Sequence, residues 1–452
     1  MFCFRSLKKV RRTILVGLAL LATMGLESTA WAVDLIGYLP YYRMNGSYNS
    51  NMLPAQLPLL DEIRYFGLTI NSSGAISTLD GASLASHTSR IAAIKQAIDA
   101  LPAADRPRLD ITLGGAGEAA AYATVAASST LRTTLAQNVD SLLDQTGATS
   151  VDFDWEHPSN ATQRSNYGLM VQRVKQEVGS ERRVYATMTP EIFMPASAFQ
   201  GANAIDGVSL MTYDLGWWGN DPGNPLQGEH SVQAYVEDSV EAWTEPPGSP
   251  NDRPWVFGSW GNNVAAANLG VGLPFYGRGV TSGNAYTYAE MVAGGTTSDG
   301  NYYNYQGQNV WIPGLSAVDE RVQYAHDKGL KNIIIWEIGQ DLDPSNANSM
   351  LRRAYEKNQS LMPVQVPGDY DGNGSVGAED YEVWRAAFGA TSGDMRADGN
   401  EDGVIDSGDY TFWRDRMVEV GGAAASVPEP ASAVGMILVG VVAILSHRNR
   451  GK

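Results

Sequence analysis

Short apolar runs alternate with amphipathic runs between residues 34 and 357. Runs with the length and composition of strands occupy residues 35–39, 63–70, 108–115, 150–156, 183–190, 207–214, 268–277 and 332–338. Between several of them, apolar residues recur every three to four positions, as at 89–101, 130–145, 164–178 and 316–329, which predicts helices. Eight strands separated by helices predict an α/β fold of the (β/α)8 TIM-barrel type. An open doubly wound sheet is the alternative, although no glycine-rich phosphate loop follows the first strand.

The strand predicted at 150–156 carries a carboxylate at every second position, as Asp152, Asp154 and Glu156. Because alternate side chains of a strand share a face, these three would point into the barrel while Phe153 and Trp155 pack outward. Burying unpaired carboxylates costs on the order of several kcal/mol or forces protonation, so the pattern indicates function. Glu156 comes last, at the strand end where barrel active sites lie, and its surroundings are expected to raise its pKa and keep it protonated as a general acid.

A divalent metal site on this strand is the alternative chemistry, since Asp-x-Asp-x-Glu also supplies hard oxygen ligands. Against it, none of the five histidines is expected at a strand end, where it could assist. Acid catalysis is therefore the preferred interpretation.

The first 32 residues are typical of an export signal. Basic residues precede the apolar run TILVGLALLATMGL, and Ala30, Trp31 and Ala32 form a small-residue cleavage site, so the mature chain is expected to begin at Val33. The only cysteine, Cys3, would leave with the signal, so no disulfide framework is expected. The net charge of −17 argues against nucleic acid as a partner, because binding it requires a basic patch.

After Leu361 the composition changes, and residues 361–368 read as a linker. Residues 369–420 contain a duplication, because DYDGNGSVGAEDYEVWR at Asp369 matches DGNEDGVIDSGDYTFWR at Asp398 with an offset of 29 residues. Both loops space oxygen ligands as an EF-hand loop does, with a glycine at the turn, which predicts structural Ca²⁺. The predicted ligands are Asp369, Asp371, Asn373 and Asp380 in the first loop and Asp398, Asn400, Asp402, Asp406 and Asp409 in the second.

Charge supports this interpretation of the module. Residues 363–420 contain 13 acidic and 4 basic residues, a net charge of −9, which requires a compensating cation. A solvated acidic linker is the alternative, but such a linker would not repeat its Trp. The duplicated loop and helix resemble a type I dockerin, which implies a cohesin-like partner or a calcium-stabilised spacer.

The tail at 421–452 contains the apolar run ASAVGMILVGVVAILS and a basic end, HRNRGK. The run is at the short limit for a transmembrane segment, which needs about 17 residues or more, and a poorly ordered apolar tail is the alternative. VPEP at Val427, the apolar run and the basic end together resemble the PEP-CTERM sorting signal of Gram-negative bacteria. This resemblance implies export to the outside or the surface of such a cell, with a transient membrane anchor and a sorting machinery as partner.

SVDFDWEHP at Ser150 resembles the catalytic strand of family 18 glycoside hydrolases, the chitinase family. Further landmarks of that family follow in order over residues 34–357: GYLPYY at Gly37, TLGG at Thr112, MTYD at Met211, GLPFYGR at Gly272 and IIIWEIGQD at Ile333. The resemblance implies hydrolysis of β-1,4-linked N-acetylglucosamine polymers such as chitin, with retention and with assistance from the substrate's acetamido group. It implies no cofactor for catalysis.

The resemblance also implies a role for each site residue. Glu156 protonates the glycosidic oxygen, Asp154 orients the acetamido group, and Asp152 holds Asp154. Tyr213 and Asp214 hydrogen-bond the N-acetyl group or the sugar. Trp336 forms the floor under the sugar, with core packing as its alternative. Further residues expected to line the substrate are Met211, Tyr38, Trp217 and Trp218.

The chain departs from the family pattern in a few places. Thr149 stands where the pattern has its first Asp, Ser150 replaces the usual Gly, and Thr112 replaces a Ser while keeping the hydroxyl. The short span between Arg278 and Asn332 implies that the extra α+β domain of some chitinases is small or absent, which leaves a shallow cleft. Two other functions stay open: an endo-β-N-acetylglucosaminidase acting on glycoproteins or peptidoglycan, and a non-catalytic sugar-binding barrel. The intact Glu156 counts against the latter.

Overall fold

The computed structural model describes residues 33–215, 229–250, 261–295, 302–362, 366–391 and 395–417. They fall into two compact units, one formed by residues 30–367 and the other containing the residues from Gly368 onward. The expected signal at 1–32 and the expected sorting tail at 421–452 lie outside the described residues. Within those residues, no helix combines the length and the apolar character needed to cross a membrane.

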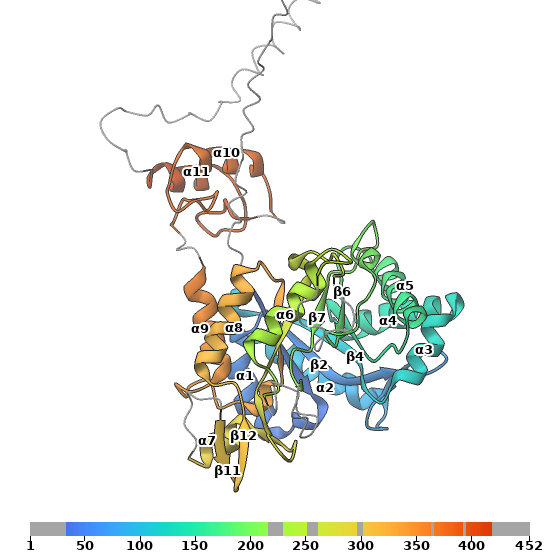
Figure 1. Cartoon of the computed structure of the whole chain (residues 1–452). Coiled ribbons are helices and arrows are strands. Elements are labelled where there is room, and N and C mark those ends of the chain that lie inside the picture. Colours follow the sequence, from blue (N-terminus) through green and yellow to red (C-terminus); the bar gives the residue numbers. More distant parts are fainter. Residues whose placement is uncertain are drawn as a thin grey trace, which may run out of the picture. The chain divides into compact units, whose positions relative to one another are not determined.

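Eight parallel strands of the first unit form a closed barrel (Figure 1). Each strand pairs with its neighbours in the barrel, and β1 closes the ring by pairing with both β2 and β13. The eight strands predicted from the sequence are all present, so the (β/α)8 prediction is confirmed. Their bounds are β1 (Asp34–Pro40), β2 (Glu62–Ile70), β4 (Arg108–Ala116), β5 (Ser150–Glu156), β6 (Arg183–Met188), β7 (Gly207–Leu210), β8 (Leu269–Pro274) and β13 (Asn332–Trp336). The short strand β3 (Ile76–Thr78) adds antiparallel to β2.

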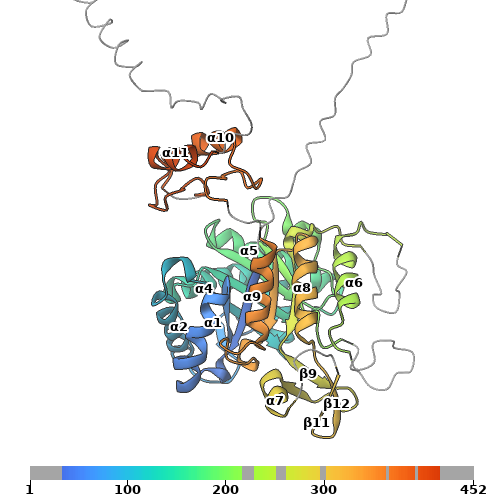
Figure 2. The same cartoon turned by 90° about the vertical axis from the view of Figure 1, so that its left-hand side faces the viewer.

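Helices surround the barrel, as the two views at right angles show (Figure 2). The longer helices bury apolar side chains in the core; α4 buries Leu135, Val139 and Leu142, a spacing of three to four residues. The cap residues explain where this helix begins and ends, since the Ser128 side chain accepts from the Leu131 amide and Gly147 takes a left-handed conformation at the end. The helices are α1 (Leu53–Gln56), α2 (Leu84–Asp99), α3 (Ala119–Ala127), α4 (Ser129–Thr146), α5 (Ala161–Val178), α6 (Gln233–Thr244), α8 (Leu315–Asp327) and α9 (Met350–Leu361).

The two faces of β5 separate apolar from acidic side chains, as predicted. Phe153 and Trp155 are fully buried in the core between strands and helices. The Trp155 ring stacks on Tyr122 of α3 with centroids 5.7 Å apart, and lies edge-on to Tyr167 of α5 at 5.2 Å. The alternate positions of β5 therefore face the barrel interior.

A small α+β insertion lies between β8 and β13. It is an antiparallel sheet in the order β10-β9-β12-β11 together with one short helix. The elements are β9 (Tyr276–Gly279), β10 (Ala285–Thr287), α7 (Tyr288–Ala293), β11 (Tyr302–Tyr305) and β12 (Gln308–Trp311). The expected extra domain is thus present in a reduced form, because α8 also has to fit between β12 and β13.

The second unit is built from two similar halves, each an acidic loop followed by a helix. The helices α10 (Ala378–Ala387) and α11 (Ser407–Arg414) share a core of buried aromatic residues. The halves also exchange hydrogen bonds: Trp384 Nε1 donates to the Asp406 carbonyl at 2.7 Å, and Trp413 Nε1 donates to the Gly377 carbonyl at 2.8 Å. The repeated Trp seen in the sequence therefore joins each half to the loop of the other.

Candidate active site

The three acidic side chains of β5 differ in exposure along the strand. Asp152 is fully buried, Asp154 is 4% exposed, and the Glu156 side chain is 25% exposed. β5 lies between β4 and β6, so its inward face looks across the barrel interior. The exposure rises toward the carboxyl end of the strand, and Glu156 is therefore the carboxyl group that a substrate in the barrel mouth reaches first.

Asp152 is held by hydroxyl groups from three other strands. It accepts hydrogen bonds from Tyr38 of β1 at 2.8 Å, Thr112 of β4 at 3.2 Å and Thr187 of β6 at 3.0 Å. Thr112 keeps the hydroxyl function expected for the Ser that it replaces. These bonds fix the carboxylate beneath Asp154 and leave it little freedom to rotate.

Asp154 lacks a comparable set of partners. Its Oδ1 atom is buried and has no hydrogen-bond partner among the described residues. Burial raises the pKa of Asp154 well above its usual range, and the carboxylates of Glu156 and Asp152 add to the rise. Leaving a buried polar atom unsatisfied costs about 1–3 kcal/mol, so such an atom in a barrel interior indicates a place for a ligand group.

Glu156 is set up to hold a proton. Burial raises the pKa of its carboxyl group, and the negative charge of Asp214 raises it further. His157 follows directly, with Nε2 3.6 Å from Glu156 Oε2, and burial lowers the pKa of His157 so that the ring stays neutral. Two histidines nevertheless lie near the site, since His157 directly follows the last residue of β5 and His230 Nδ1 lies 3.6 Å from Asp214 Oδ1. Within the described ranges, neither histidine belongs to a group of three or more side chains placed to bind one metal ion.

Asp214 is locked in place by the residues of the GLPFYGR motif. Tyr276 donates to its Oδ1 at 2.7 Å, and Arg278 donates to both of its oxygens at 2.8 and 2.6 Å. Burial opposes its charge, but Arg278 lowers the pKa of Asp214 overall. Asp214 therefore carries a fixed negative charge that faces Glu156. No role was predicted for Tyr276 and Arg278, although both belong to the GLPFYGR motif. A Tyr and an Arg at alternate positions after a strand could have indicated that both side chains face the site.

Four of the side chains predicted to contact the substrate lie together inside the barrel, where Tyr38 is buried at 1% exposure. Met211, Tyr213, Tyr38 and Trp336 belong to one apolar cluster, which also contains Phe66. The Trp336 ring lies 5.5 Å from the Tyr38 ring and 5.0 Å from the Phe66 ring, measured between centroids. Trp217 and Trp218 lie outside the described residues.

A second charged cluster lies below the predicted site and was missed from the sequence. Glu62 and Arg64 of β2 and Asp110 of β4 are fully buried inside the barrel. Arg64 Nε lies 3.0 Å from Glu62 Oε1 and 2.9 Å from Asp110 Oδ2. The signal was the same as for β5, namely charged residues at alternate positions of an apolar strand.

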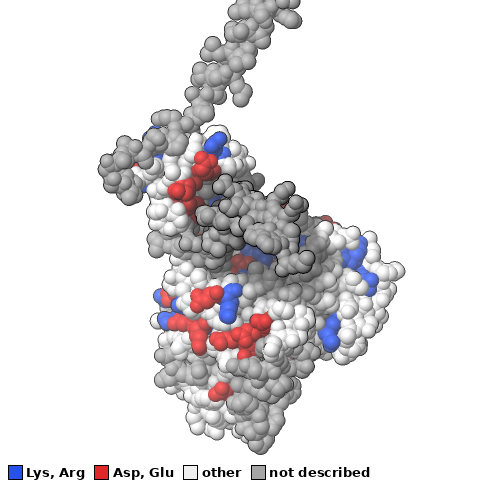
Figure 3. Space-filling model, turned by 45° about the horizontal axis from the view of Figure 1, so that its top comes forward, with Lys and Arg blue, Asp and Glu red and all other residues white. Residues whose placement is uncertain are grey.

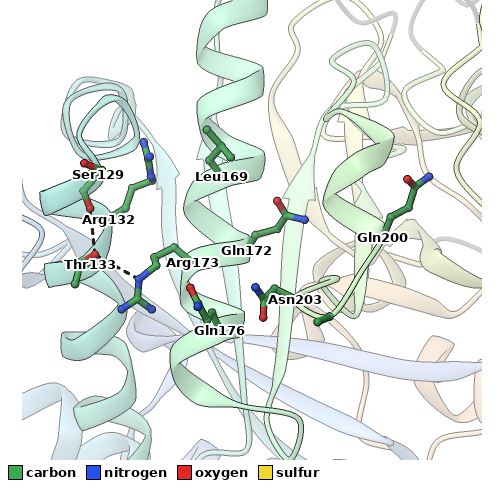
Figure 4. A pocket seen from close by; sticks show the side chains of 10 residues that line it. Ser129, Arg132, Thr133, Leu169, Gln172, Arg173, Gln176, Gln200 and Asn203 are labelled. Carbon is green, nitrogen blue, oxygen red and sulfur yellow. Dashed lines mark hydrogen bonds between the residues drawn. The ribbon is translucent and has the colours of Figure 1, made fainter.

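A cavity of about 400 Å³ lies on the outside of the barrel, between α4, α5 and the segment near Asn203 (Figure 4). It is lined by amide side chains and by Arg132 and Arg173, and none of the β5 carboxylates contributes to it. Arg173 donates to Thr133 at 3.3 Å. This cavity is separate from the carboxylate site.

The predicted calcium ligands lie in the two acidic loops of the second unit. Asp369, Asp371 and Asp380 each bring a carboxylate oxygen within 4.8 Å of the other two, which suits a hard cation. Burial raises the pKa of Asp371 and of Asp380, and neighbouring carboxylates add to both. The polar side chains of the second loop also hydrogen-bond within the module. Asp398 accepts from the Gly403 amide, and the Asn400 side chain donates to Asp402. Asp406 caps α11, and Asp409 accepts from the backbone amides of Asn400 and Asp406. Asn373 accepts from the Ser375 amide.

A closed parallel barrel with a carboxyl group of raised pKa at one strand end, a fixed carboxylate facing it and a cluster of aromatic side chains is typical of a barrel glycosidase. The family model of the glycosyl hydrolases family 18 matches residues 37–341. The chain belongs to this family and is a glycosidase of the chitinase type.

Similar proteins span most of the chain. Endochitinase 1 of Metarhizium anisopliae is 22% identical over 382 residues, which covers 72% of this chain and 88% of that protein. The family 18 chitinase ChiB of Flavobacterium johnsoniae has a similar structure, with a TM-score of 0.55 and 20% identity over 73% of this chain and 94% of its own. A variant of the class V chitinase from Nicotiana tobaccum, solved in complex with NAG4, gives a TM-score of 0.53 with 16% identity over 72% of this chain and 98% of its own. At these identities the solved structures show the fold.

Proposed function

We propose that this protein is exported and hydrolyses β-1,4-linked polymers of N-acetylglucosamine, with chitin as the substrate class, by a retaining mechanism in which the substrate assists. The observation that carries the proposal is the buried Asp154 carboxyl group, which lies between Asp152 and Glu156 and has an oxygen without a hydrogen-bond partner in the part of the chain that the structure describes. The chitinase names of the similar proteins support the substrate class, and so does the NAG4 complex of one of them.

Asp214 is the remaining acidic group that faces Glu156, and its contacts make it a poor nucleophile. Arg278 and Tyr276 occupy both of its oxygens through short hydrogen bonds and fix its orientation. A carboxylate held in this way stabilises charge more readily than it forms a covalent bond. The nucleophile is then the acetamido group of the sugar bound next to the scissile bond.

In the first step Glu156 donates its proton to the glycosidic oxygen while the acetamido carbonyl oxygen attacks the anomeric carbon. The bond from that carbon to the glycosidic oxygen breaks, the leaving sugar departs as an alcohol, and an oxazolinium ion remains. The unpartnered oxygen of Asp154 accepts the acetamido N–H and stabilises the positive charge of the ring. Water then attacks the anomeric carbon from the vacated face and returns a proton to Glu156, which restores the acetamido group and retains the configuration.

Proton NMR of the first sugar anomer formed from chito-oligosaccharides tests this proposal. We expect the β-anomer first, and no hydrolysis of cellulose or of fully deacetylated chitosan. Glu156→Gln is expected to lose activity by about 10²- to 10⁴-fold while binding persists, and Asp154→Ala is expected to lose activity with Glu156 intact. An initial α-anomer, or ready hydrolysis of cellulose, would contradict substrate assistance.

A glycoprotein and a peptidoglycan assayed in parallel separate chitinase action from endo-β-N-acetylglucosaminidase action.

We also propose that the second unit is a dockerin-like module that binds Ca²⁺. The clustered oxygens of Asp369, Asp371 and Asp380 support this, as does the matching acidic loop at 398–409. When bound, calcium would neutralise carboxylates that otherwise repel one another. A cohesin-like partner for this module and a sorting machinery for the tail belong to the same proposal.

A further inference from the structure

Among the described residues, Arg64 is the one fully buried arginine whose guanidinium contacts the site from below. It lies on β2 and faces the interior with no exposed surface. Its Nη1 atom donates to the Tyr38 hydroxyl at 3.1 Å and lies 3.5 Å from Asp152 Oδ1. The guanidinium carbon also lies over the Tyr185 ring, 4.7 Å from its centroid. Four strands therefore enclose this side chain and hold it in one orientation.

The distribution of charge leaves Arg64 as the counter-ion of the catalytic pair. Burial raises the pKa of Asp110 well above its usual range, and the neighbouring Glu62 raises it further, which favours the neutral form of Asp110. Glu62 has a second cation, because Arg108 Nε lies 3.4 Å from its Oε2 atom. In the described ranges, Arg64 is the one cation within ion-pair distance of Asp152.

We propose that Arg64 is a positioning residue for catalysis: its guanidinium, acting through Tyr38 and directly, holds a negative charge on the Asp152–Asp154 pair and keeps that pair aligned beneath the acetamido group. This inference rests on the proposed function. It assigns Arg64 to the charge and the alignment of the pair and leaves proton donation to Glu156.

The other groups facing the pair are hydroxyls and carboxyls, which cannot supply this positive charge. Tyr122 of α3 and Tyr167 of α5 are the groups from the helices, and the remaining groups lie on the barrel strands or directly after one. They are Tyr38 of β1, Glu62 of β2, Asp110 and Thr112 of β4, Glu156 of β5, Thr187 of β6, and Tyr213 after β7. Without Arg64, the pair would be protonated more readily, because a positive charge at this distance lowers the pKa of a carboxyl group by about 1–3 units.

The test compares four variants of the full chain. Arg64→Met/Glu62→Gln removes the guanidinium while leaving the net charge of the interior unchanged, and Arg64→Lys keeps the charge. Arg108→Met is the matched control, because it removes a cation from the same network without touching Asp152. Arg64→Gln keeps a hydrogen-bond donor and is measured in the same way in case the double variant unfolds.

For each variant, kcat and KM for chito-oligosaccharides are measured across pH. The double variant is expected to lose kcat by about 10- to 100-fold with KM little changed, as misalignment of a catalytic group does. The acidic limb of its profile is expected to move to higher pH by about 1–3 units, since protonation inactivates the pair. Arg64→Lys is expected to keep the limb of the parent, and Arg108→Met to keep both the limb and kcat.

A second readout does not depend on hydrolysis. The titration of the pair is followed by NMR in protein carrying ¹³C-labelled aspartate, with Asp152→Asn used to assign the signals. The inference is overturned if Arg64→Met/Glu62→Gln and Arg64→Gln titrate and work as the parent does, or if Arg108→Met produces the same shift. If the parent does not cleave chito-oligosaccharides, the proposed function fails, and the NMR titration still decides the role of Arg64.

Discussion

At the scale of single residues, neighbours rather than residue type separate the roles of four carboxyl groups. Asp152 accepts from hydroxyls, Asp154 has an oxygen without a partner among the described residues, Glu156 faces a negative charge, and Asp214 is clamped by Arg278. These surroundings raise the pKa of Glu156 and lower that of Asp214, although the two groups have similar intrinsic acidity. This arrangement lets Glu156 act as an acid beside the charged carboxylate of Asp214.

The pH profile of kcat/KM tests the pairing of Glu156 with Asp214. An acid catalyst is lost as pH rises through its pKa, so Glu156 sets the basic limb. Asp214→Asn removes the negative charge that raises the pKa of Glu156 and that offsets the Arg278 cation, and both changes lower that pKa. We expect the basic limb to move to lower pH.

The matched control for this measurement is Asp319→Asn, which breaks an Asp–Arg pair with Arg353 on the outer helices. Its profile should superimpose on that of the parent. A basic limb that stays in place or moves to higher pH in Asp214→Asn would show that Asp214 does not set the acidity of Glu156.

At the scale of elements, the contact between β4 and β5 depends on glycine. Gly114 and Gly115 of the TLGG motif have positive φ angles of 122° and 125°. A Cβ atom on Gly114 would lie 2.1 Å from the Asp154 carbonyl oxygen and 3.0 Å from the Tyr122 hydroxyl. The absence of a side chain therefore lets β4 approach the backbone that carries the catalytic carboxylates.

Gly114→Ala should consequently displace Asp154 and weaken the barrel. Overpacking of this kind costs about 1–3 kcal/mol, to which an unfavourable φ angle adds. We expect a lower melting temperature together with a kcat reduced by about 10-fold or more, because the acetamido group would no longer be aligned. Thermal unfolding and steady-state kinetics measure the two effects.

Gly46→Ala is the control for this variant, since a Cβ there meets no atom within 4 Å. It should leave both quantities close to those of the parent. If Gly114→Ala melted and hydrolysed substrate as the parent does, the close approach of β4 would not position the site.

At the scale of the whole molecule, the two compact units have separate cores. The barrel core and the aromatic core around Trp384 and Trp413 share no residue. Charge is also uneven, since residues 363–420 account for −9 of the net −17. On the face shown in Figure 3, acidic and basic side chains occur in small separate groups. The two units are therefore expected to respond differently to the removal of cations.

Removing calcium should unfold the second unit and leave the barrel active. Without the ion, Asp369, Asp371 and Asp380 repel one another across a few ångströms, and the small aromatic core cannot offset this. We expect a chelator to reduce helical circular dichroism and change tryptophan fluorescence, while hydrolysis of chito-oligosaccharides continues at the same rate. Asp369→Asn removes one of the clustered carboxylates and so isolates the contribution of the module to these signals. Asp415→Asn, which changes an exposed carboxylate outside the cluster, is the control.

Parallel loss of hydrolysis and of module structure would argue against independent units. A module whose signals do not change in chelator would argue against calcium as its ligand.

The sequence by itself determined the barrel and the acidic strand, because both depend on local periodicity. Side chains of a strand alternate between its faces, so carboxylates at 152, 154 and 156 had to share one face with Phe153 and Trp155 on the other. The extent of the same apolar run also placed Glu156 at the end of its strand. The duplication could be recognised from the sequence because it is a match between two segments of one chain.

Only the tertiary structure decided which groups surround those carboxylates. Arg64 reaches Asp152 across 88 positions of sequence, and Arg278 reaches Asp214 across 64, because closing the barrel brings distant strands together. A pKa depends on burial and on the charges within a few ångströms, neither of which is local in sequence. For this reason a strand pattern predicted where the acid lies, whereas its proton and its alignment depend on residues that only the folded barrel identifies.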